Sequence, residues 1–407
     1  MLRSLFTGIS GLINHQTRMD VVGNNIANVN TTGYKSSRVT FGDMMSQTLS
    51  GASPAQGGRG GTNPKQVGLG VNLATIDSVH IQGALQSTGV MTDMSIQGDG
   101  FFILGDGTTN RYTRDGSFGL DEVGFLVEPA NGLKVQGWTA VNGVLDTSQP
   151  IGDLQIPVAA EMTALATANA QLAGNLDAGA AVGDTYSNTF IVYDSLGASH
   201  SVNITYTKTA VNTWDWVASG TGIVVGPGVN QGQLTFNPDG SLNTQSGNLS
   251  IVTTNGSTTP LAIAPSFADV TQLSDVNTVN LFGQDGYAPG TLVSFNISNS
   301  GIITGVFDNG INQTLGQVAL ARFTNNSGLV KEGENLWTES VNSGVAQVGT
   351  ANSGARGGVA AGSLEMSNVS LAQEFSDMII TQRGFQANSR IITTSDEILQ
   401  ELINLKR

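Results

Sequence analysis

The sequence predicts a mainly β protein with α-helical coiled-coil termini and, between them, nested discontinuous β-domains. Three observations support this fold class. Apolar residues near both ends recur at alternating three- and four-residue steps, a spacing that lines one face of a helix and is typical of a coiled coil. Short apolar segments bounded by turn residues fill the middle of the chain. Glycine-rich stretches, 51–70 and 344–362, separate each end from this middle.

The first expected element is a helix from Leu2 to Ala27. Gln16 and Gly23 interrupt its apolar seam, so we expect this helix to be marginal in isolation. A heptad seam needs a partner helix to cover it. The seam residues that would make this contact are Leu5, Ile9, Leu12, Met19 and Ile26.

An asparagine-rich segment follows the first helix. Asparagine and glycine tolerate the left-handed backbone angles found at helix C-termini. The segment is therefore an ordinary helix end, a junction that redirects the chain between structural layers, or both. Its residues are Asn24, Asn25, Asn28, Asn30, Thr32, Gly33 and Tyr34.

Residues 28–70 and 344–363 are expected to form a connector region. The stretch 51–70 contains Pro54 and Pro64 and has no apolar periodicity, which indicates an extended or flexible segment.

Strands are expected to dominate from residue 71 onward. Turn dipeptides such as Asp106-Gly107 indicate hairpins, and the apolar segments 292–297, 302–307 and 318–323 predict a meander. Turns also account for the aspartate–glycine pairs, since none matches the spacing of a calcium-binding loop.

The middle of the chain is expected to hold one β-domain inside another. Between residues 151 and 284 there is one basic residue, Lys208, against nine acids. This shift in composition marks 151–284 as an inserted outer β-domain. The first β-domain would then consist of 71–150 plus 285–343.

The last expected element is a helix from Leu371 to Leu405. Ser370 and Gln373 have the spacing of a capping box at its start. Together with 1–27, the segment 364–407 would form a domain of terminal coiled-coil helices. The seam residues of the second helix are Leu371, Phe375, Met378, Phe385, Ile392, Leu399 and Ile403.

Composition excludes several classes of function. The formal net charge is −14, and such a surface repels phosphate backbones, which argues against nucleic-acid binding. The chain has no cysteine, so disulfides and thiolate metal sites are excluded. No stretch approaches the roughly 20 apolar residues of a membrane span, so membrane insertion is not expected. The N-terminus lacks the apolar run and cleavage site of a signal peptide.

The sequence shows no pattern that would support catalysis or a cofactor. Nucleophile and phosphate-binding motifs are missing, so we expect neither an enzyme nor a cofactor. His15, His80 and His200 lie far apart in the sequence, which argues against a metal site. His15 is expected on the helix surface. The four tryptophans are expected to pack in a core or against a neighbouring subunit rather than to bind sugars.

Three motifs resemble the family of bacterial flagellar rod, hook and hook-associated proteins. Residues 24–35 resemble the N-terminal signature of the family, 95–102 its first β-domain, and 382–400 its C-terminal helix. The motifs occur in the expected order and cover both ends and the first domain, whereas 151–284 carries little of the resemblance beyond its length and β character.

The resemblance implies a structural subunit that polymerises into a curved hollow tube, the flagellar hook, which acts as a flexible universal joint and transmits torque from rod to filament. The terminal helices would form the inner tube. The implied partners are other copies of the chain, the hook cap, the distal rod protein, the hook–filament junction protein and the flagellar export apparatus. The subunit would be exported without a cleaved signal peptide and would lie outside the cell.

Three alternatives remain open. A distal rod protein would resemble the chain at both ends, but its expected shorter length and missing insert argue against it. An extracellular carbohydrate-binding β-domain would leave the terminal heptads unexplained. A surface adhesin would normally carry a signal or anchor. The seams themselves could join the two helices of one chain in a hairpin; their different lengths and the long polar connectors favour packing between subunits.

Overall fold

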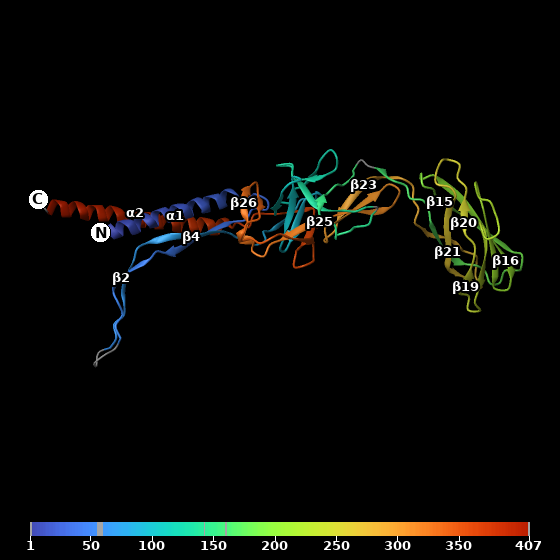
Figure 1. The fold of residues 1–407 in the computed structure, drawn as a ribbon, viewed down its shortest axis with the longest axis horizontal. Helices are drawn as coiled ribbons and strands as arrows, with labels where there is room; N and C mark the ends of the chain where they lie inside the picture. The colour runs from blue at the N-terminus through green and yellow to red at the C-terminus, as the bar shows by residue number, and fades with distance from the viewer. Residues whose placement is uncertain (1, 55–59, 142, 159–160, 406–407) are drawn as a thin grey trace. The chain divides into compact units, whose positions relative to one another are not determined.

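The computed structural model describes residues 2–54, 60–141, 143–158 and 161–405, except for the side chains of Leu2 and Leu402. The chain divides into two compact units. The first combines 1–156, 296–304 and 314–407, and the second combines 157–295 and 305–313. The predicted fold class is confirmed, because strands fill the middle of the chain and a long helix lies at each end (Figure 1). Neither helix in the described part of the chain has the length and apolarity needed to cross a membrane.

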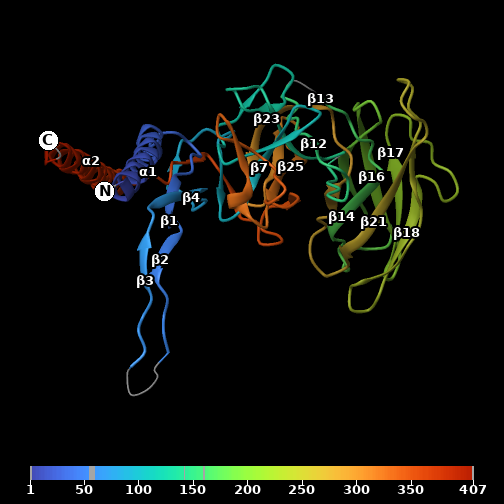
Figure 2. The same ribbon diagram turned by 60° about the vertical axis from the view of Figure 1, so that its left-hand side comes forward.

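The helices α1 (Leu2–Ala27) and α2 (Leu371–Leu405) begin and end where the apolar periodicity predicts. They lie side by side and antiparallel, since Gly8 near the start of α1 faces Ile392 and Arg18 further along pairs with Asp377 (Figures 1 and 2). The predicted capping box does not form. Gln373 donates instead to Asp377 one turn later, at 3.3 Å.

The first predicted connector contains strands. β1 (Ser37–Asp43) pairs antiparallel with β4 (Val71–Ser78), and β2 (Ser46–Ser50) pairs with β3 (Lys65–Gly68). Within 51–70, β3 is an extended strand paired with β2, which agrees with the expectation of an extended segment and not with that of a flexible one. Residues 55–59 lie outside the described part. β2 and β3 have only five and four residues, so each is too short to display an apolar alternation.

The second predicted connector is also incorporated into sheets. β28 (Gln347–Thr350) pairs with β25 (Asn312–Arg322), and β29 (Gly358–Ala361) pairs with β6 (Met94–Gln97). β30 (Ser363–Glu365) pairs with β5 (Leu85–Ser87). Glycine and alanine are small enough for close approach of neighbouring strands, so a glycine-rich composition here does not mean a loose segment.

The main sheet of the first unit runs in the order β25-β11-β7-β8-β27-β26. The predicted meander is confirmed, because β23 (Gly290–Ile297), β24 (Ile302–Phe307) and β25 are hydrogen-bonded in that order. A buried cluster that includes Phe101, Trp138 and Trp337 packs against this sheet. The remaining elements are β7 (Phe101–Gly105), β8 (Asn110–Thr113), β9 (Gly119–Leu120), β10 (Leu126–Val127), β11 (Lys134–Thr139), β12 (Gly152–Asp153), η1 (Asn326–Gly328), β26 (Val330–Gly333) and β27 (Leu336–Thr338).

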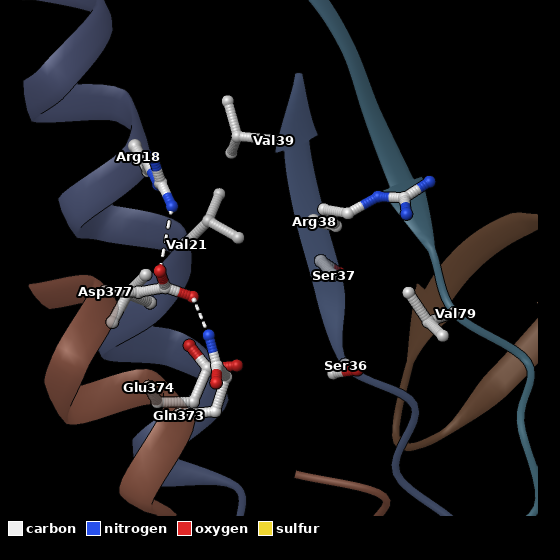
Figure 3. A pocket seen from close by; sticks show the side chains of 11 residues that line it. Arg18, Val21, Ser36, Ser37, Arg38, Val39, Val79, Gln373, Glu374 and Asp377 are labelled. Atoms are coloured by element: carbon white, nitrogen blue, oxygen red, sulfur yellow. Dashed lines mark hydrogen bonds and ion pairs between the residues drawn. The ribbon is translucent and has the colours of Figure 1, made fainter. Parts of the chain in front are cut away.

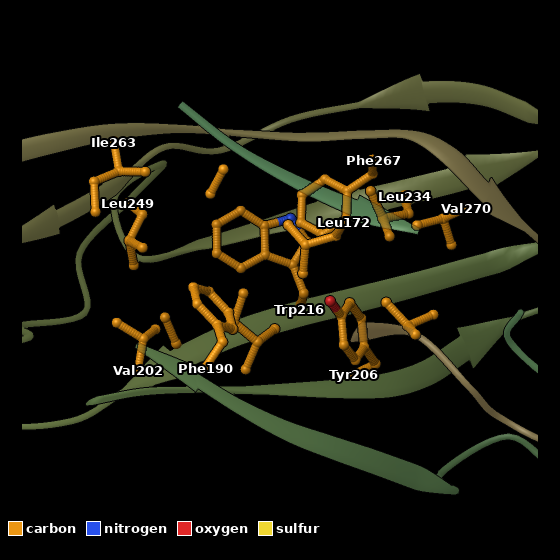
Figure 4. Packing of buried hydrophobic residues seen from close by; sticks show 14 of the residues in the cluster. Leu172, Phe190, Val202, Tyr206, Trp216, Leu234, Leu249, Ile263, Phe267 and Val270 are labelled. Atoms are coloured by element: carbon orange, nitrogen blue, oxygen red, sulfur yellow. The ribbon is translucent and has the colours of Figure 1, made fainter. Parts of the chain in front are cut away.

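The second unit is a sandwich of two sheets with one apolar core (Figure 4). One sheet has the order β15-β16-β17-β18-β19 and the other β20-β21-β14-β22. Trp214 and Trp216 are fully buried on one face of β17, as expected for residues two apart on a strand. Trp216 packs against Phe267 with ring centroids 5.6 Å apart. The strands of these two sheets are β14 (Asn169–Asn175), β15 (Thr185–Tyr193), β16 (Ser199–Ala210), β17 (Thr213–Ser219), β18 (Gln231–Phe236), β19 (Leu242–Gln245), β20 (Leu249–Ile251), β21 (Leu261–Thr271) and β22 (Asn280–Gln284). β13 (Glu161–Met162) belongs to neither of them and pairs antiparallel with β23.

Candidate assembly site

The contact between α1 and α2 is lined by small residues. A Cβ atom on Gly8 would lie 3.2 Å from Ile392 Cγ1, and a Cβ atom on Gly11 would lie 2.6 Å from Asn388 Nδ2. On the other helix, a Cβ atom on Gly384 would meet the ring of His15 at 2.7 Å. At these three points the helices pack closely, and a larger residue would require a side chain of the other helix to move. One predicted seam residue, Ile392, lies at one of these points opposite Gly8, whereas the three glycines are not part of the predicted seam.

Many of the predicted seam residues stay exposed. Phe375 exposes 50% and Ile403 exposes 68% of its surface. Ile9, Leu371 and Phe385 are also exposed. The half-buried members of the predicted seam are Leu5, Leu12, Met19, Ile26, Met378, Ile392 and Leu399. The pairing within one chain thus leaves a substantial part of the predicted apolar seam open to solvent.

A pocket of about 290 Å³ lies where α1, α2 and β1 meet (Figure 3). Arg18 Nη2 lies 3.0 Å from Asp377 Oδ1, which joins the two helices across one side of the pocket. Val39 and Val79 form part of its apolar wall. Burial raises the pKa of Glu374 in this pocket, while a hydrogen bond from Asn25 opposes the rise.

The asparagine-rich segment forms the junction between α1 and the strands. Asn25 is buried, and its Nδ2 donates to the Ser37 carbonyl at 2.8 Å and to Glu374 Oε1 at 3.0 Å. Its Oδ1 accepts from the Ser37 amide at 3.0 Å and from the Tyr34 hydroxyl at 3.2 Å. One side chain therefore ties the end of α1 to β1 and to α2.

The other motif residues close the turn after α1. Asn28 donates to the Asn24 carbonyl at 2.9 Å, and Thr32 donates to Asp115 Oδ2 at 2.8 Å. Gly33 has φ 66°, a left-handed conformation that favours glycine. Asn30 is exposed. The motif thus combines a helix end with a junction to the first β-unit.

A buried charge cluster holds this junction to β30. Glu365 Oε1 lies 2.6 Å from Lys35 Nζ, and Glu365 Oε2 lies 3.2 Å from Arg114 Nη1. Burial lowers the pKa of Lys35 and that of Arg114, and the negative charge of Glu365 opposes both shifts. Two cations facing one carboxylate in a buried site make Glu365 the group on which the local charge balance depends.

Two of the histidines lie in the first unit, at positions that the sequence did not indicate. The expectation that His15 is a surface residue is wrong: it is half-buried between Gly384 and Phe41, whose ring centroid is 5.9 Å away. Its packing follows from the glycine opposite it, which leaves room for a ring. Burial, together with the charges of the nearby Lys35 and Arg114, lowers the pKa of His80 to about 4.

Sequence reasoning missed the residues that complete the junction. Glu365 was recognisable as an isolated acid in a stretch dominated by glycine, alanine and serine. Asn368 accepts from the Ser36 amide at 2.8 Å and donates to the Val79 carbonyl at 2.7 Å. No local pattern links either residue to its partners, which lie between 251 and 332 positions earlier in the chain.

Four protein families match successive parts of the chain. The flagella basal body rod protein family matches 5–35, and the flagellar hook protein FlgE/F/G D1 domain matches 95–169. The flagellar basal body protein FlaE D2 domain matches 164–287. The flagellar basal body rod FlgEFG protein C-terminal family matches 360–405. The matches include both helices and the segment 151–284, on which the sequence motifs were silent.

Relatives match over the whole chain. The flagellar hook protein FlgE of Treponema pallidum is 42% identical over an alignment that covers 100% of both chains. The flagellar basal-body rod protein FlgG of Bacillus subtilis is 35% identical, also over 100% of both chains. The identity to the hook protein is higher than the identity to the rod protein, which favours the hook protein.

A solved structure has the same fold. The flagellar hook protein FlgE2 of Helicobacter pylori aligns with a TM-score of 0.54 at 15% identity, and the alignment covers 67% of this chain and 98% of that one. Because the full-length identity to a hook protein is 42% and the fold agrees, the chain belongs to the flagellar hook protein FlgE family and is a structural subunit of the bacterial flagellar hook.

Proposed function

We propose that the α1–α2 pair is the polymerisation element of this hook subunit and forms the inner tube. The observation that carries the proposal is the exposure of the seam residues, of which Phe375 and Ile403 are the clearest examples. Burial of one such side chain contributes roughly 1.5–3 kcal/mol. A few of these contacts per subunit are sufficient to offset the loss of translational and rotational freedom on assembly.

The β-units would surround this tube as middle and outer layers, and the predicted outer layer is the insert 151–284. The proposal includes no catalytic step. Its partners are other copies of the chain, the hook cap, the distal rod protein, the hook–filament junction protein and the flagellar export apparatus. The subunit would reach the cell exterior through that apparatus without a cleaved signal peptide.

Electron microscopy of the full-length protein, concentrated with a salting-out salt, tests the proposal directly. Curved tubes of uniform width are the expected product. Straight rods would favour the distal rod alternative. Particles that remain monodisperse when seeded with tube fragments would contradict self-assembly.

A matched pair of variants tests the role of the seam. Phe375→Ser removes an exposed ring from α2, whereas Val341→Ser changes a fully exposed residue outside the helices. We expect Phe375→Ser to raise the critical concentration for polymerisation about tenfold or more, equivalent to at least about 1.4 kcal/mol. Val341→Ser should leave it unchanged. Equal critical concentrations for the two variants would exclude Phe375 from the interface.

A further inference from the structure

The asparagine–glycine dipeptides of the chain can react with their own backbone. In this reaction the amide nitrogen of the glycine attacks Cγ of the asparagine, and the missing side chain of glycine leaves the approach unhindered. The dipeptides are 131–132, 142–143, 255–256 and 309–310, of which residue 142 lies outside the described part. The other three have the same pair of residues, so the fold decides which of them reacts.

The three dipeptides differ in what the glycine amide does. The Gly132 amide donates to the Glu128 carbonyl at 2.8 Å, and the Gly310 amide donates to the Phe307 carbonyl at 3.0 Å. Among the residues that the structure describes, none accepts from the Gly256 amide. An amide that donates must break its hydrogen bond before it can attack, which costs free energy. The Gly256 nitrogen therefore reacts without this cost.

The side-chain carbonyl of Asn255 accepts from both donors of one residue. The Ser257 amide donates to Asn255 Oδ1 at 3.2 Å, and the Ser257 hydroxyl donates to the same oxygen at 2.7 Å. The ring closed by the first hydrogen bond contains both Asn255 Cγ and the Gly256 nitrogen, so one turn holds the two reacting atoms. Two donors on Oδ1 stabilise the negative charge that develops there during attack.

The second donor distinguishes Asn255 from the other asparagines. In the described part of the chain, Asn131 Oδ1 and Asn309 Oδ1 each accept from one group, the amide two residues further on, at 3.0 Å in both cases. Neither has a hydroxyl in the position that Ser257 provides. Activation of the carbonyl is therefore strongest at Asn255.

The surroundings of Asn255 orient its amide and leave room for the reaction. Asn255 Nδ2 donates to Asp194 Oδ2 at 2.6 Å, which fixes the side-chain amide with Oδ1 towards Ser257. Asn255 is exposed, and a Cβ atom on Gly256 would have no neighbour within 4 Å. Water therefore reaches both residues.

We propose that Asn255 is a site of spontaneous deamidation, which the fold favours over the other described asparagine–glycine dipeptides. The Gly256 nitrogen gives its proton to water and forms a bond to Asn255 Cγ. The bond from Cγ to Nδ2 breaks, and Nδ2 takes up a proton from water and leaves as ammonia. The product is a succinimide ring, which a water molecule opens at either carbonyl to give an aspartate or an isoaspartate.

This reaction would break the link between the loop 252–260 and the turn 194–198. The new carboxylate cannot donate to Asp194, as Asn255 Nδ2 does. It also brings a second negative charge next to a fully buried carboxylate, and like charges repel strongly where little water screens them. Deamidation at Asn255 should therefore destabilise the second unit.

Peptide mass spectrometry of the full-length protein tests the proposal. The unassembled protein is kept at pH 8 and sampled over weeks, and a second sample is kept unfolded in urea at the same pH. Exchange of an amide for a carboxyl group is read from the peptide masses, and labelling by an isoaspartate-specific methyltransferase identifies the isoaspartate. Because the chain is unassembled, the result does not depend on the proposed polymerisation.

In the folded protein we expect Asn255 to convert at least about fivefold faster than Asn131 or Asn309, the factor that corresponds to one backbone hydrogen bond. In urea the three rates should be similar, because the fold no longer distinguishes the dipeptides. Equal rates in the folded protein, or a faster reaction at Asn131 or Asn309, would overturn the proposal. Conversion of Asn255 in urea but not in the folded protein would also overturn it.

Ser257→Ala tests the second donor, since it removes the hydroxyl and keeps the amide. We expect it to slow the conversion of Asn255 severalfold. Ser241→Ala is the matched control, because Ser241 Oγ donates to Asp239 in another turn of the second unit; the rate at Asn255 should then be unchanged. Circular dichroism verifies that both variants are folded. An unchanged or faster reaction in folded Ser257→Ala would overturn the role of the hydroxyl.

Discussion

Glu365 and Lys35 form a fully buried ion pair, with 2.6 Å between Oε1 and Nζ, although 330 positions separate them in the sequence. Glu365 also accepts from the Gly83 amide at 2.8 Å. The carboxylate thus joins the segment after α1, the segment before β5 and the strand that leads into α2. This connection links both helices to the first β-unit.

Replacement of Glu365 by glutamine should destabilise the first unit strongly. The variant leaves Lys35 and Arg114 buried without a counter-charge, and breaking a buried pair in this way costs about 3–5 kcal/mol. Urea denaturation combined with amide exchange on β5 and β30 measures the loss.

Glu332→Gln is the matched control for this prediction. Glu332 pairs with Arg111 at 2.7 Å, but 40% of its side chain is exposed, and exposed pairs contribute about 0–1 kcal/mol. If the two variants were equally stable, the buried cluster would not be what holds the junction.

Gly33→Ala should disrupt the junction, because the site has neither the space nor the backbone angle for a side chain. A Cβ atom would lie 2.5 Å from the Asp115 amide nitrogen and 2.7 Å from the Arg114 carbonyl carbon, and φ is 66°. Both neighbours are backbone atoms, so they cannot rotate away. We expect a loss of about 1–3 kcal/mol in thermal or chemical unfolding.

Gly23→Ala, in the same region, should stabilise the protein, whereas Gly33→Ala should destabilise it. A Cβ atom on Gly23 would have no neighbour within 4 Å, and the residue lies inside α1. Alanine favours a helix over glycine by about 1 kcal/mol. The variant should therefore slow amide exchange in α1. Destabilisation by both substitutions would show that the turn geometry is not the reason for the effect at Gly33.

The helices show how far sequence reasoning extends. Their bounds follow from a long apolar periodicity, which is a local signal. The line along which they meet does not follow from it, because contact there depends on the absence of side chains at Gly8, Gly11 and Gly384. An apolar pattern identifies surfaces that need cover. It does not say which of them a partner from the same chain covers.

The junction shows a second limit. The asparagine-rich motif predicted a helix end and a change of chain direction. Asn25 serves both, because at the end of α1 its side chain donates to the Ser37 carbonyl of β1 and to Glu374 of α2. The ion pair of Glu365 with Lys35 could not be predicted, because it depends on pairing β5 with β30 across more than 270 residues. Charge pairing at that separation is decided by the tertiary fold and leaves no local pattern.

Glu128 should make the first unit less stable as the pH rises from about 4.5 to about 7. Burial raises the pKa of Glu128 to about 7; a hydrogen bond from Asn131 opposes the rise, and the charges of Asp115 and Glu334 add to it. The folded chain therefore keeps a proton that the unfolded chain releases near pH 4.5. Each unit of pKa difference corresponds to 1.36 kcal/mol, so the effect amounts to about 3 kcal/mol.

Glu128→Gln should abolish this pH dependence and raise stability above pH 7, since glutamine is uncharged and can still accept from Asn131. Unfolding by urea at pH 5 and pH 8 measures both effects. Glu122→Gln is the control, because Glu122 is an exposed carboxylate in the same part of the chain. A slope that persists in Glu128→Gln would assign the pH dependence to another group.

Asp194 should make the second unit less stable as the pH falls, whereas Glu128 makes the first unit less stable as the pH rises. Its side chain is fully buried in the turn between β15 and β16, where it accepts from His200 at 2.9 Å and from Asn255 at 2.6 Å. The amides of Leu196 and Ala198 donate to its other oxygen, each at 2.9 Å. Burial alone would raise the pKa of Asp194, but these four hydrogen bonds outweigh it and hold the pKa below its usual range.

A depressed pKa in the folded chain means that the ionised carboxylate stabilises the fold above the ordinary aspartate pKa of about 3.9, and that this contribution is lost as the pH falls below it.

Asp194→Asn should remove much of this stabilisation at neutral pH as well, because an amide nitrogen cannot accept from two of the four donors. We expect a loss of about 1–3 kcal/mol and faster amide exchange in β15 and β16. Asp239→Asn, at an exposed turn where the carboxylate accepts from the Ser241 amide at 3.0 Å, should have a smaller effect. Equal effects would mean that burial of the Asp194 network adds nothing to the stability of an ordinary turn.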